Sequence, residues 1–410
     1  MKNKIFLSFF LSVILTAPVL SDNKKEFNLP EIIELGIKNN PLISAKLREV
    51  EAKEAAYQAS KRLFNPELEL QKGKAKSHDS SIKRNTDGVS LSQYFENPLK
   101  RHYRIQMNEK DWQAAKYLFD FSKLELTFEI KNLYYRIILL KNKKEFARKN
   151  LDSIQNIYEL IKKRVNLGET KELEAIKLYV ETLRAQNELN KIQTELRLAK
   201  ENLNKFLGNL LPPDFSVSGE LDYKPCAILE KSLLDKALFS HPLIKTKEKD
   251  LEYAKSNINY VKWQRFPDFT LSGFIHRELH GKDKGIGLSL EIPLWNLKSK
   301  EIAEAESLHL KQSEELRALK MEIATEIKAK VSRLRLSEQI IQLFHKGLLK
   351  QAEESLKISE TSYKQGEISL IDYLDSQRTY YSILKDYQDS LCDWNTDKAA
   401  LEKAIGEEIR

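Results

Sequence analysis

The 410-residue sequence has few of the residues that interrupt helices or cross-link chains. It contains 13 glycines, 11 prolines and two cysteines, while 31% of its residues are charged. A globular chain of this length usually has more turn residues, so the composition predicts long helices. Two cysteines cannot form a disulfide-based scaffold. Cys226 lies in a proline-containing linker and Cys392 in the last expected helix, which leaves open both a single disulfide and two separate thiols.

Long apolar runs are also missing, except at the N-terminus. Lys2 and Lys4 precede "IFLSFFLSVIL", a run that is short for a bilayer-spanning helix and typical of a secretory signal peptide. Tolerated residues before Asp22 place the expected cleavage after Ser21. A membrane anchor is the alternative, whereas no cysteine follows the run to carry an N-terminal lipid. We therefore expect residues 1–21 to direct export from the cytoplasm.

The sequence has none of the common catalytic or nucleotide-binding motifs. It contains no G-x-S-x-G, H-E-x-x-H, P-loop or G-x-G-x-x-G pattern, and "GIG" at 285–287 lies in an expected strand without a third glycine. His276 and His280 in "HRELH" offer two metal ligands without a third. The formal net charge of +8 is spread over many helices, whereas a nucleic-acid footprint would be clustered. We expect no enzyme activity, cofactor, bound metal or nucleic-acid partner.

The sequence does, however, contain an internal repeat. "NNPLI" at 39–43 matches "SHPLI" at 240–244, and each motif is followed 25 residues after its proline by another proline. A 40-residue glycine spacing also recurs, at Gly168 and Gly208 and again at Gly366 and Gly406. Chance agreement of these spacings is improbable, so the pattern predicts duplication of one structural unit.

We expect the two repeats to span residues 22–208 and 230–410, with an equatorial linker at 209–229. Each repeat should contain a helix, a β-hairpin, a very long helix, a turn and another helix. Pro66 and Pro267 end the first helices because proline cannot occupy a helix interior. The segments from about 99 to 164 and from about 298 to 363 contain no proline, and each predicts an unbroken helix roughly 100 Å long.

Alternating apolar and polar residues predict two half-buried strands in each repeat. In the first repeat, the alternation lies in "PELELQ" and "GVSLSQYF". In the second, it lies around Phe269, Leu271 and Ile275 and in "IGLSLEI". Polar links at 74–87 and 277–284 should turn each pair of strands into a hairpin.

Heptad spacing predicts that the long helices pack laterally against other helices. The pattern appears in three sets of apolar residues: Ile327, Val331, Leu334, Ile341, Phe344 and Leu348; Leu173, Ile176, Val180 and Leu183; and Leu196, Ala199, Leu203 and Phe206. Any long coiled coil would show the same spacing, so the heptads alone do not identify the fold.

Short strands with one apolar face have no place in a plain coiled coil. Four strands cannot close a sheet, an open edge cannot lie in lipid, and membrane barrels begin at eight strands. A trimer would supply twelve. Trp263 and Trp295 flank the second hairpin at one edge of its apolar band, where an aromatic membrane girdle is expected. Ordinary packing where the helices join is the alternative for both tryptophans.

These motifs together resemble the TolC-type outer-membrane efflux family over nearly the whole mature chain. "NPLI…FNPELEL" and "HPLI…FPDFTL" resemble its junctions between helix and first strand, and the wording "NPELEL" is similar to the heavy-metal exporter branch. "RVNLGETKELEAIK" (164–177) and "SYKQGEISLIDYLD" (362–375) resemble its two periplasmic hairpin tips. The resemblance implies an α+β fold: a homotrimer with a helical coiled-coil barrel across the periplasm and a transmembrane β-barrel in the outer membrane.

The function implied by this resemblance is that of a passive exit duct. The partners would be outer-membrane lipid, a periplasmic adaptor (a membrane fusion protein) and an inner-membrane pump of the RND or ABC type. A structural coiled-coil protein of the periplasm and the outer component of type I protein secretion are alternatives. An adaptor should carry one hairpin with small β domains rather than two complete repeats.

The resemblance also assigns roles to residues near the tips. Asp372 and Asp375 match paired aspartates that ring the periplasmic entrance, Glu174 matches a further acid, and Tyr363 matches a tyrosine that hydrogen-bonds across tips. Carboxylates repeated around a narrow opening would select cations. At position 368, where some members of the family carry an arginine, this chain has isoleucine, so no ion pair can close the gate from there.

The adaptor would contact the turns themselves, at Leu167, Gly168, Gln365 and Gly366. The two glycines should relieve backbone strain where the chain reverses. The acids that follow them, Glu169 and Glu367, lie near the next helix N-terminus, where simple helix capping explains negative charge equally well.

Overall fold

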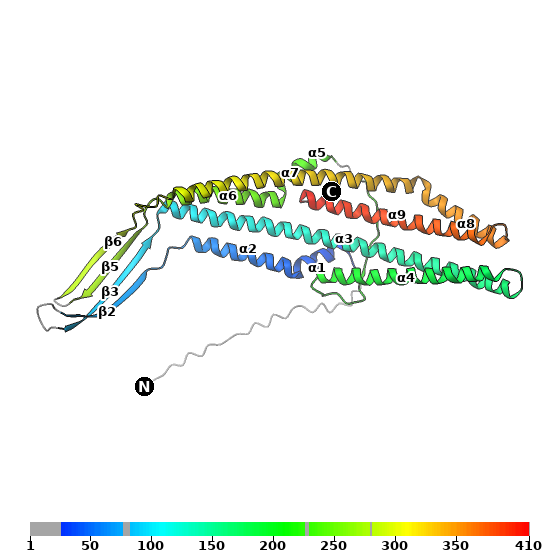
Figure 1. Cartoon of the computed structure of the whole chain (residues 1–410), viewed down its shortest axis with the longest axis horizontal. Helices are drawn as coiled ribbons and strands as arrows, with labels where there is room; N and C mark the ends of the chain where they lie inside the picture. Colours follow the sequence, from blue (N-terminus) through cyan, green and yellow to red (C-terminus); the bar gives the residue numbers. More distant parts are fainter. Residues whose placement is uncertain (1–25, 77–82, 226–228, 279–280, 410) are drawn as a thin grey trace, which may run out of the picture.

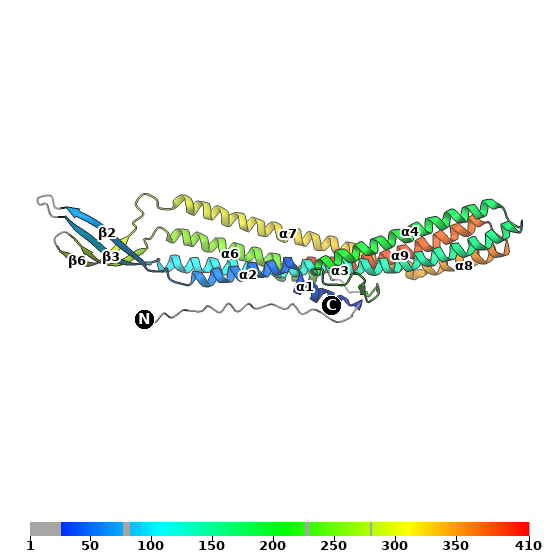
Figure 2. The ribbon, with the colours of Figure 1, turned by 90° about the horizontal axis from the view of Figure 1, so that it is seen from below.

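The computed structural model describes residues 26–76, 83–225, 229–278 and 281–409. The expected signal peptide, Cys226 and His280 lie outside these ranges. The described chain is elongated, with a β-sheet at one end and two helical hairpin tips at the other (Figures 1 and 2). None of its helices combines the length and the apolar character needed to cross a bilayer.

The two halves of the chain contain the same order of main elements. In the first half these are α1 (Leu29–Asn39), α2 (Pro41–Ser60), β2 (Glu67–Lys76), β3 (Lys83–Phe95), α3 (Pro98–Asn166) and α4 (Glu172–Phe206). In the second half they are α5 (Glu230–Ser240), α6 (Pro242–Trp263), β5 (Phe269–Arg277), β6 (Lys282–Leu290), α7 (Ser299–Leu343), α8 (Leu349–Gln365) and α9 (Leu370–Ile405). The expected unbroken helix at 99–164 is confirmed by α3.

The expected unbroken helix at 298–363 is wrong. A π-helical segment, η1 (Phe344–Leu348), separates α7 from α8, and Gly347 within it has a φ of 117°. No proline marks the break, and glycine adopts this backbone conformation without the steric cost that other residues meet. The helix therefore bends before it reaches the tip, as Figure 1 shows between α7 and α8.

The four long strands form one antiparallel sheet in the order β2-β3-β5-β6. The two hairpins are joined through β3 and β5, where Phe95 pairs with Phe269. The strands continue through most of the expected polar links: β2 extends to Lys76 and β3 begins at Lys83, while β5 extends to Arg277 and β6 begins at Lys282. The links predicted at 74–87 and 277–284 were therefore too long, because backbone pairing continues past the apolar band.

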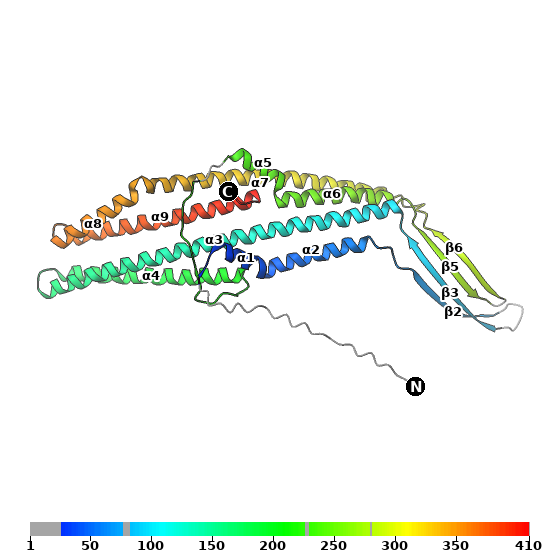
Figure 3. The same cartoon turned by 180° about the vertical axis from the view of Figure 1, so that it is seen from behind.

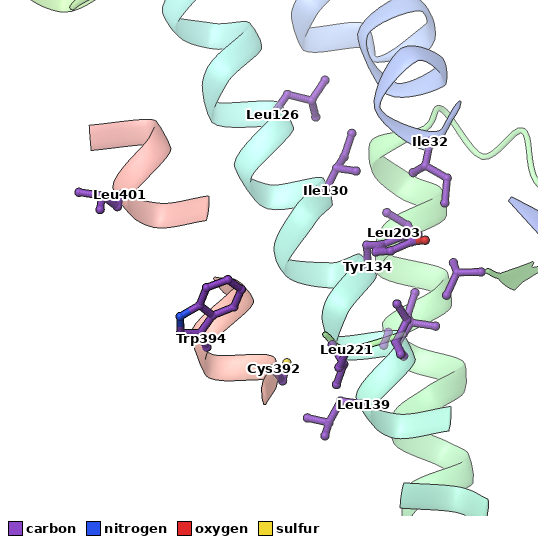
Figure 4. Close-up of a cluster of buried hydrophobic side chains, with 14 of the residues drawn as sticks. Ile32, Leu126, Ile130, Tyr134, Leu139, Leu203, Leu221, Cys392, Trp394 and Leu401 are labelled. Carbon is purple, nitrogen blue, oxygen red and sulfur yellow. The ribbon is translucent and has the colours of Figure 1, made fainter. Parts of the chain in front are cut away.

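A small parallel pairing ties the start of the described chain to the linker. β1 (Glu26–Phe27) pairs with β4 (Ser216–Val217). The main core lies beside this pairing at mid-length, where α1, α3, α4, α9 and the linker meet (Figure 4). Ile130, Leu203 and Leu401 are fully buried there. This core therefore joins helices from both halves of the chain.

Asparagine or histidine before proline starts three of the long helices. Asn40, Asn97 and His241 each accept a hydrogen bond from a backbone N–H of the first helical turn. Proline follows each of them at the first helical position, where its missing N–H costs nothing. These N-caps set the starts of α2, α3 and α6.

Two of these caps also join helices end to end. Asn40 is buried and donates from Nδ2 to the carbonyl of Phe206 at the end of α4 (2.9 Å). His241, also buried, occupies the equivalent place beside α9 and bonds the backbone of Lys403. Figure 3 shows α2 and α4 meeting in this way alongside α3. Burial lowers the pKa of His241 to about 4, because the buried imidazole favours its neutral form.

We expect this histidine to make the stability of the mid-length core depend on pH. Since the folded-state pKa lies below the ordinary value near 6.5, unfolding takes up a proton, and stability is lost as the pH falls from about 6.5 to 4. The loss reaches ~3 kcal/mol at most. The free energy of unfolding, measured with denaturant at several pH values, should fall less steeply with decreasing pH in His241→Asn. This variant places at position 241 the residue found at the corresponding cap, Asn40. Equal slopes in the two proteins would contradict the assignment.

Candidate functional site

The two hairpin tips, formed by α3–α4 and α8–α9, carry most of the residues that the sequence singled out. Gly168 and Gly366 adopt left-handed conformations, with φ of 78° and 80°. The N–H after each glycine bonds back into the preceding helix, Glu169 to the Arg164 carbonyl and Glu367 to the Ser362 carbonyl, both at 2.9 Å. Both turns thus end their helices by the same backbone motif, which a side chain at either glycine would strain.

The turn residues predicted to meet an adaptor all lie on the surface. Gly168, Gln365 and Gly366 are exposed, and 73% of Leu167 is accessible. An exposed leucine at the end of a hairpin does not contribute to the core of this chain. The geometry therefore leaves these four residues free to contact another protein.

The predicted gate residues form two pairs: Tyr363, which is buried, with the half-buried Glu174, and the two exposed aspartates. The hydroxyl of Tyr363 on α8 donates to the carboxylate of Glu174 on α4 across the two hairpins (3.4 Å). Burial, reinforced by the negative charge of Glu174, raises the pKa of Tyr363 to about 12. The tyrosine therefore remains a neutral donor at physiological pH and ties the second hairpin to the first.

Asp372 and Asp375 are both exposed in the first turns of α9. Asp372 also forms a capping box with Ser369, whose hydroxyl donates to the Asp372 carboxylate at 2.7 Å. The pattern Ser-x-x-Asp at 369–372 carries this signal in the sequence, and our sequence analysis missed it. Asp375 has no such local role, so its carboxylate is the better candidate for contact with passing ions.

An apolar cluster lies beneath the gate residues. The Tyr363 ring stacks on Tyr373 with centroids 5.4 Å apart. Ile161 and Leu178 from the first hairpin are fully buried in the same cluster. Ile368, at the position where some relatives carry arginine, is half-buried against it. Ile368 therefore adds an apolar contact between the turn and this cluster.

Two ion pairs between the hairpins were not predicted from the sequence. Arg378 on α9 contacts Glu181 on α4 at 2.6 Å, and Lys385 contacts Glu188 at 3.3 Å. In both pairs the partners are 197 residues apart, and the pairs are one heptad apart along both helices. Charges at a heptad spacing on both helices were a visible signal, but only the lateral register of the hairpins pairs them.

The two tryptophans occupy different environments at the base of the sheet. Trp295 is 89% exposed just after β6. Trp263 ends α6, is half-buried and packs against Phe266 with ring centroids 4.8 Å apart. The paired strand ends Phe269 and Leu290 place both residues at the same margin of the sheet. Trp295 suits the girdle interpretation, whereas Trp263 also has the packing role that we considered as the alternative.

Side chains of the kinds that ligate metal ions also occur in the described ranges. Within them, no group of three or more histidine, cysteine or acidic side chains is arranged to hold a metal ion. Cys392 is a buried free thiol beside the core, and burial raises its pKa to about 11. This thiol therefore lacks the ready ionisation that a reactive cysteine needs.

Comparisons with known proteins agree with this arrangement. The chain is 21% identical to the cobalt-zinc-cadmium resistance protein CzcC of Cupriavidus metallidurans, over 86% of this chain and 84% of CzcC. It is also 21% identical to the outer membrane protein TolC of Vibrio cholerae, over 92% and 90% of the two chains. The crystal structure of CusC superposes with a TM-score of 0.78 at 16% identity, covering 92% of each chain.

The family model described as "Outer membrane efflux protein" matches residues 32–209 and 233–407. These segments contain both sheet hairpins and both tips. The chain therefore belongs to the outer membrane efflux protein family, as its sequence motifs predict.

Proposed function

We propose that three copies of this chain form one conduit, with a shared β-barrel in the outer membrane and a helical tunnel across the periplasm. The observation that carries the proposal is the open sheet. Among the described residues, β2 and β6 pair on one side only, and one face of the sheet exposes Leu68, Leu91 and Ile286. Pairing β6 with β2 of the next copy removes every free edge, as a lipid environment requires.

The helices support the same assembly. Leu173, Ile176, Val180 and Leu183, one of the expected heptad sets, are exposed on α4 rather than buried. Ile358 is exposed on α8, and α4 and α8 lie at opposite edges of the helical layer at the tips. An apolar heptad face that finds no partner within the chain is expected to pack against a second copy. We propose that α8 of one copy covers α4 of its neighbour.

As a member of this family the chain is a passive channel protein and not an enzyme. We propose that its two halves are structural repeats, at 22–208 and 230–410 around a linker at 209–229, and that an adaptor joins the exposed turns to an inner-membrane pump. The name of the relative CzcC, together with Glu67 and Glu69 on the inward face of the sheet, favours cations as cargo. Type I protein secretion is the alternative use of the same duct.

Cross-linking followed by conductance measurements tests the conduit directly. Protein purified from outer membranes in detergent should cross-link as a trimer and produce discrete conductance steps in planar bilayers. A monomer that never inserts into bilayers would exclude the conduit and favour a structural coiled-coil protein.

The proposed gate predicts a change in ion selectivity. Asp372→Asn with Asp375→Asn removes six carboxylates from a trimer, so we expect loss of most of the cation preference and weaker block by multivalent cations. Reversal potentials in a salt gradient measure this preference. Glu322→Gln with Glu326→Gln on α7, far from the tips, removes the same charge and should leave selectivity nearly unchanged. If the tip variant and this control behave alike, the aspartates do not form the constriction.

A further inference from the structure

The outward face of the sheet changes abruptly from apolar to basic along its length. Directly paired residues share a face, and Leu70 pairs with Val89, which pairs in turn with Ile275. Further from the helices, the same face of β2 continues with Lys72, Lys74 and Lys76. The apolar band therefore ends at the distal margin, and lysine replaces leucine at the alternate positions.

Seven basic residues form this margin, which we call the basic band: Lys72, Lys74, Lys76, Lys83, Arg277, Lys282 and Lys284. All seven are exposed. In the described strands, Asp87 is the one acidic residue on this face, and it lies 3.6 Å from Arg277. The opposite face carries Asp283, Glu67 and Glu69. Apart from Arg84, which lies on the opposite face, the lysines and arginines of the described strands lie on one face and at one level of the sheet.

The basic band is strongest at the two edges of the sheet. β2 contributes three lysines and β6 contributes two. If β6 of one copy pairs with β2 of the next, five lysines gather at each junction between copies. Lysines placed only to keep edges from aggregating would be expected along the whole edge. Here the basal half of β2 has none, and two members of the band, Lys83 and Arg277, lie on the inner strands β3 and β5.

An apolar hollow lies next to the basic band on the same face. Gly273 lacks a side chain between Leu91 and Ile286, and a Cβ built at this glycine would meet nothing within 4 Å. The resulting hollow of about 600 Å³ is also lined by Ile275 and Lys284. A lysine at the rim of an apolar hollow matches the two ends of a lipid, an acyl chain and a charged headgroup.

We propose that the basic band binds the phosphate groups of a phosphorylated lipid in the outer leaflet, with an acyl chain in the hollow at Gly273. The inference rests on the proposed function, because the apolar face must first lie in a membrane. Ammonium groups attract anionic headgroups by charge and donate hydrogen bonds to phosphate oxygens. Binding at the junctions would hold adjacent copies together in the membrane.

Lipid binding by the purified full-length trimer tests the proposal. The probe is fluorescent lipid A bearing two phosphates, in dodecyl maltoside micelles, compared with the same lipid after dephosphorylation and with inorganic phosphate as a competitor. Native protein should retain the phosphorylated lipid preferentially, and millimolar phosphate should displace little of it. Equal retention of the two lipids would overturn the proposal. Full displacement by phosphate would show a free-anion site and would overturn it as well.

Substitutions in the basic band should abolish the preference. Each lysine near an anionic lipid surface is worth about fivefold in affinity, so Lys72→Gln, Lys74→Gln and Lys76→Gln together should weaken binding on the order of 100-fold. The same three positions changed to arginine should bind as the native protein does. Lys191→Gln, Lys205→Gln and Lys231→Gln remove equal charge from exposed helix positions and should have little effect. Equal losses in the strand and helix variants would overturn the assignment to the band.

Conductance of the same preparation separates the two hypotheses. Conducting trimers without phosphate-dependent lipid binding would refute the basic band and leave the duct intact. A preparation that neither assembles nor conducts would refute both.

Discussion

Lys131→Met is expected to lower the free energy of unfolding by ~3–5 kcal/mol, the usual cost of leaving one member of a buried ion pair alone. Lys131 lies on α3 in the mid-length core, where its Nζ contacts the carboxylates of Glu402 (2.7 Å) and Glu408 (3.2 Å). The side chains of Lys131 and Glu402 are each only 11% exposed. Burial opposes the charge on Lys131, but hydrogen bonds and charge from the two glutamates outweigh it and raise the pKa.

The effect should come from the acid left behind rather than from the lost lysine. Without Lys131, Glu402 would be a buried carboxylate with little water to replace the ammonium group. Replacing both partners, as in Lys131→Met with Glu402→Met, should therefore recover most of the loss, because two apolar side chains suit the same space. Since the pair joins α3 to α9, the single variant should loosen the contact between the two halves of the chain.

Thermal and denaturant unfolding followed by circular dichroism measures this prediction. The matched control is Lys149→Met on the same helix. Lys149 pairs with Glu145 at 2.7 Å, but both side chains are more than 60% exposed. Water screens such an exposed pair and leaves it little effect on stability, so the control should lie close to the native protein. If the two variants have equal free energies of unfolding, the buried pair does not stabilise the mid-length core.

Much of this fold is encoded in local features that a sequence displays. Proline after a capping residue starts α2, α3 and α6, and glycine ends the helices at the tips. Period-two alternation locates the strands. The predicted strand lengths were wrong: polar residues at 74–76 and 83–87 were assigned to a link, although the backbone pairing of β2 with β3 continues through them. Gly347 was overlooked because the extent of the long helix was judged from its lack of proline alone.

The contacts that join the two hairpins could not be predicted in the same way. Tyr363 and Glu174 were identified separately, through resemblance, and their hydrogen bond depends on how the two hairpins pack against each other at the tips. The Arg378–Glu181 pair depends on the same lateral register. The heptad set that includes Leu173 and Ile176 was predicted to pack against another helix, but it is exposed within one chain. Lateral register between distant segments arises from tertiary packing, which neither periodicity nor capping specifies.

Removing the hydrogen bond and the two ion pairs between the hairpins is expected to give the largest change in conductance. In the variant Tyr363→Phe with Arg378→Gln and Lys385→Gln, α8–α9 loses its hydrogen bond to Glu174 and its ion pairs to Glu181 and Glu188. A hydrogen bond to a charged group is worth ~1.5–3 kcal/mol and an exposed ion pair ~0.2–1 kcal/mol. At 3.4 Å the tyrosine bond belongs at the low end, which gives a total of about 2–3 kcal/mol for each copy.

A shift of this size changes the ratio of closed to open tips by at least about tenfold for each copy, because 1.4 kcal/mol corresponds to a factor of ten. If the tips form the proposed gate, single channels of the triple variant should show several times the native conductance. The matched control is Lys350→Gln with Lys364→Gln, which removes two ion pairs within α8, to Glu354 and Glu360, and none between hairpins. Native conductance in the triple variant, or an equal rise in the control, would mean that the hairpin ties do not hold the entrance closed. Because Tyr363→Phe keeps the ring that stacks on Tyr373, such a result could not be attributed to collapse of the tip.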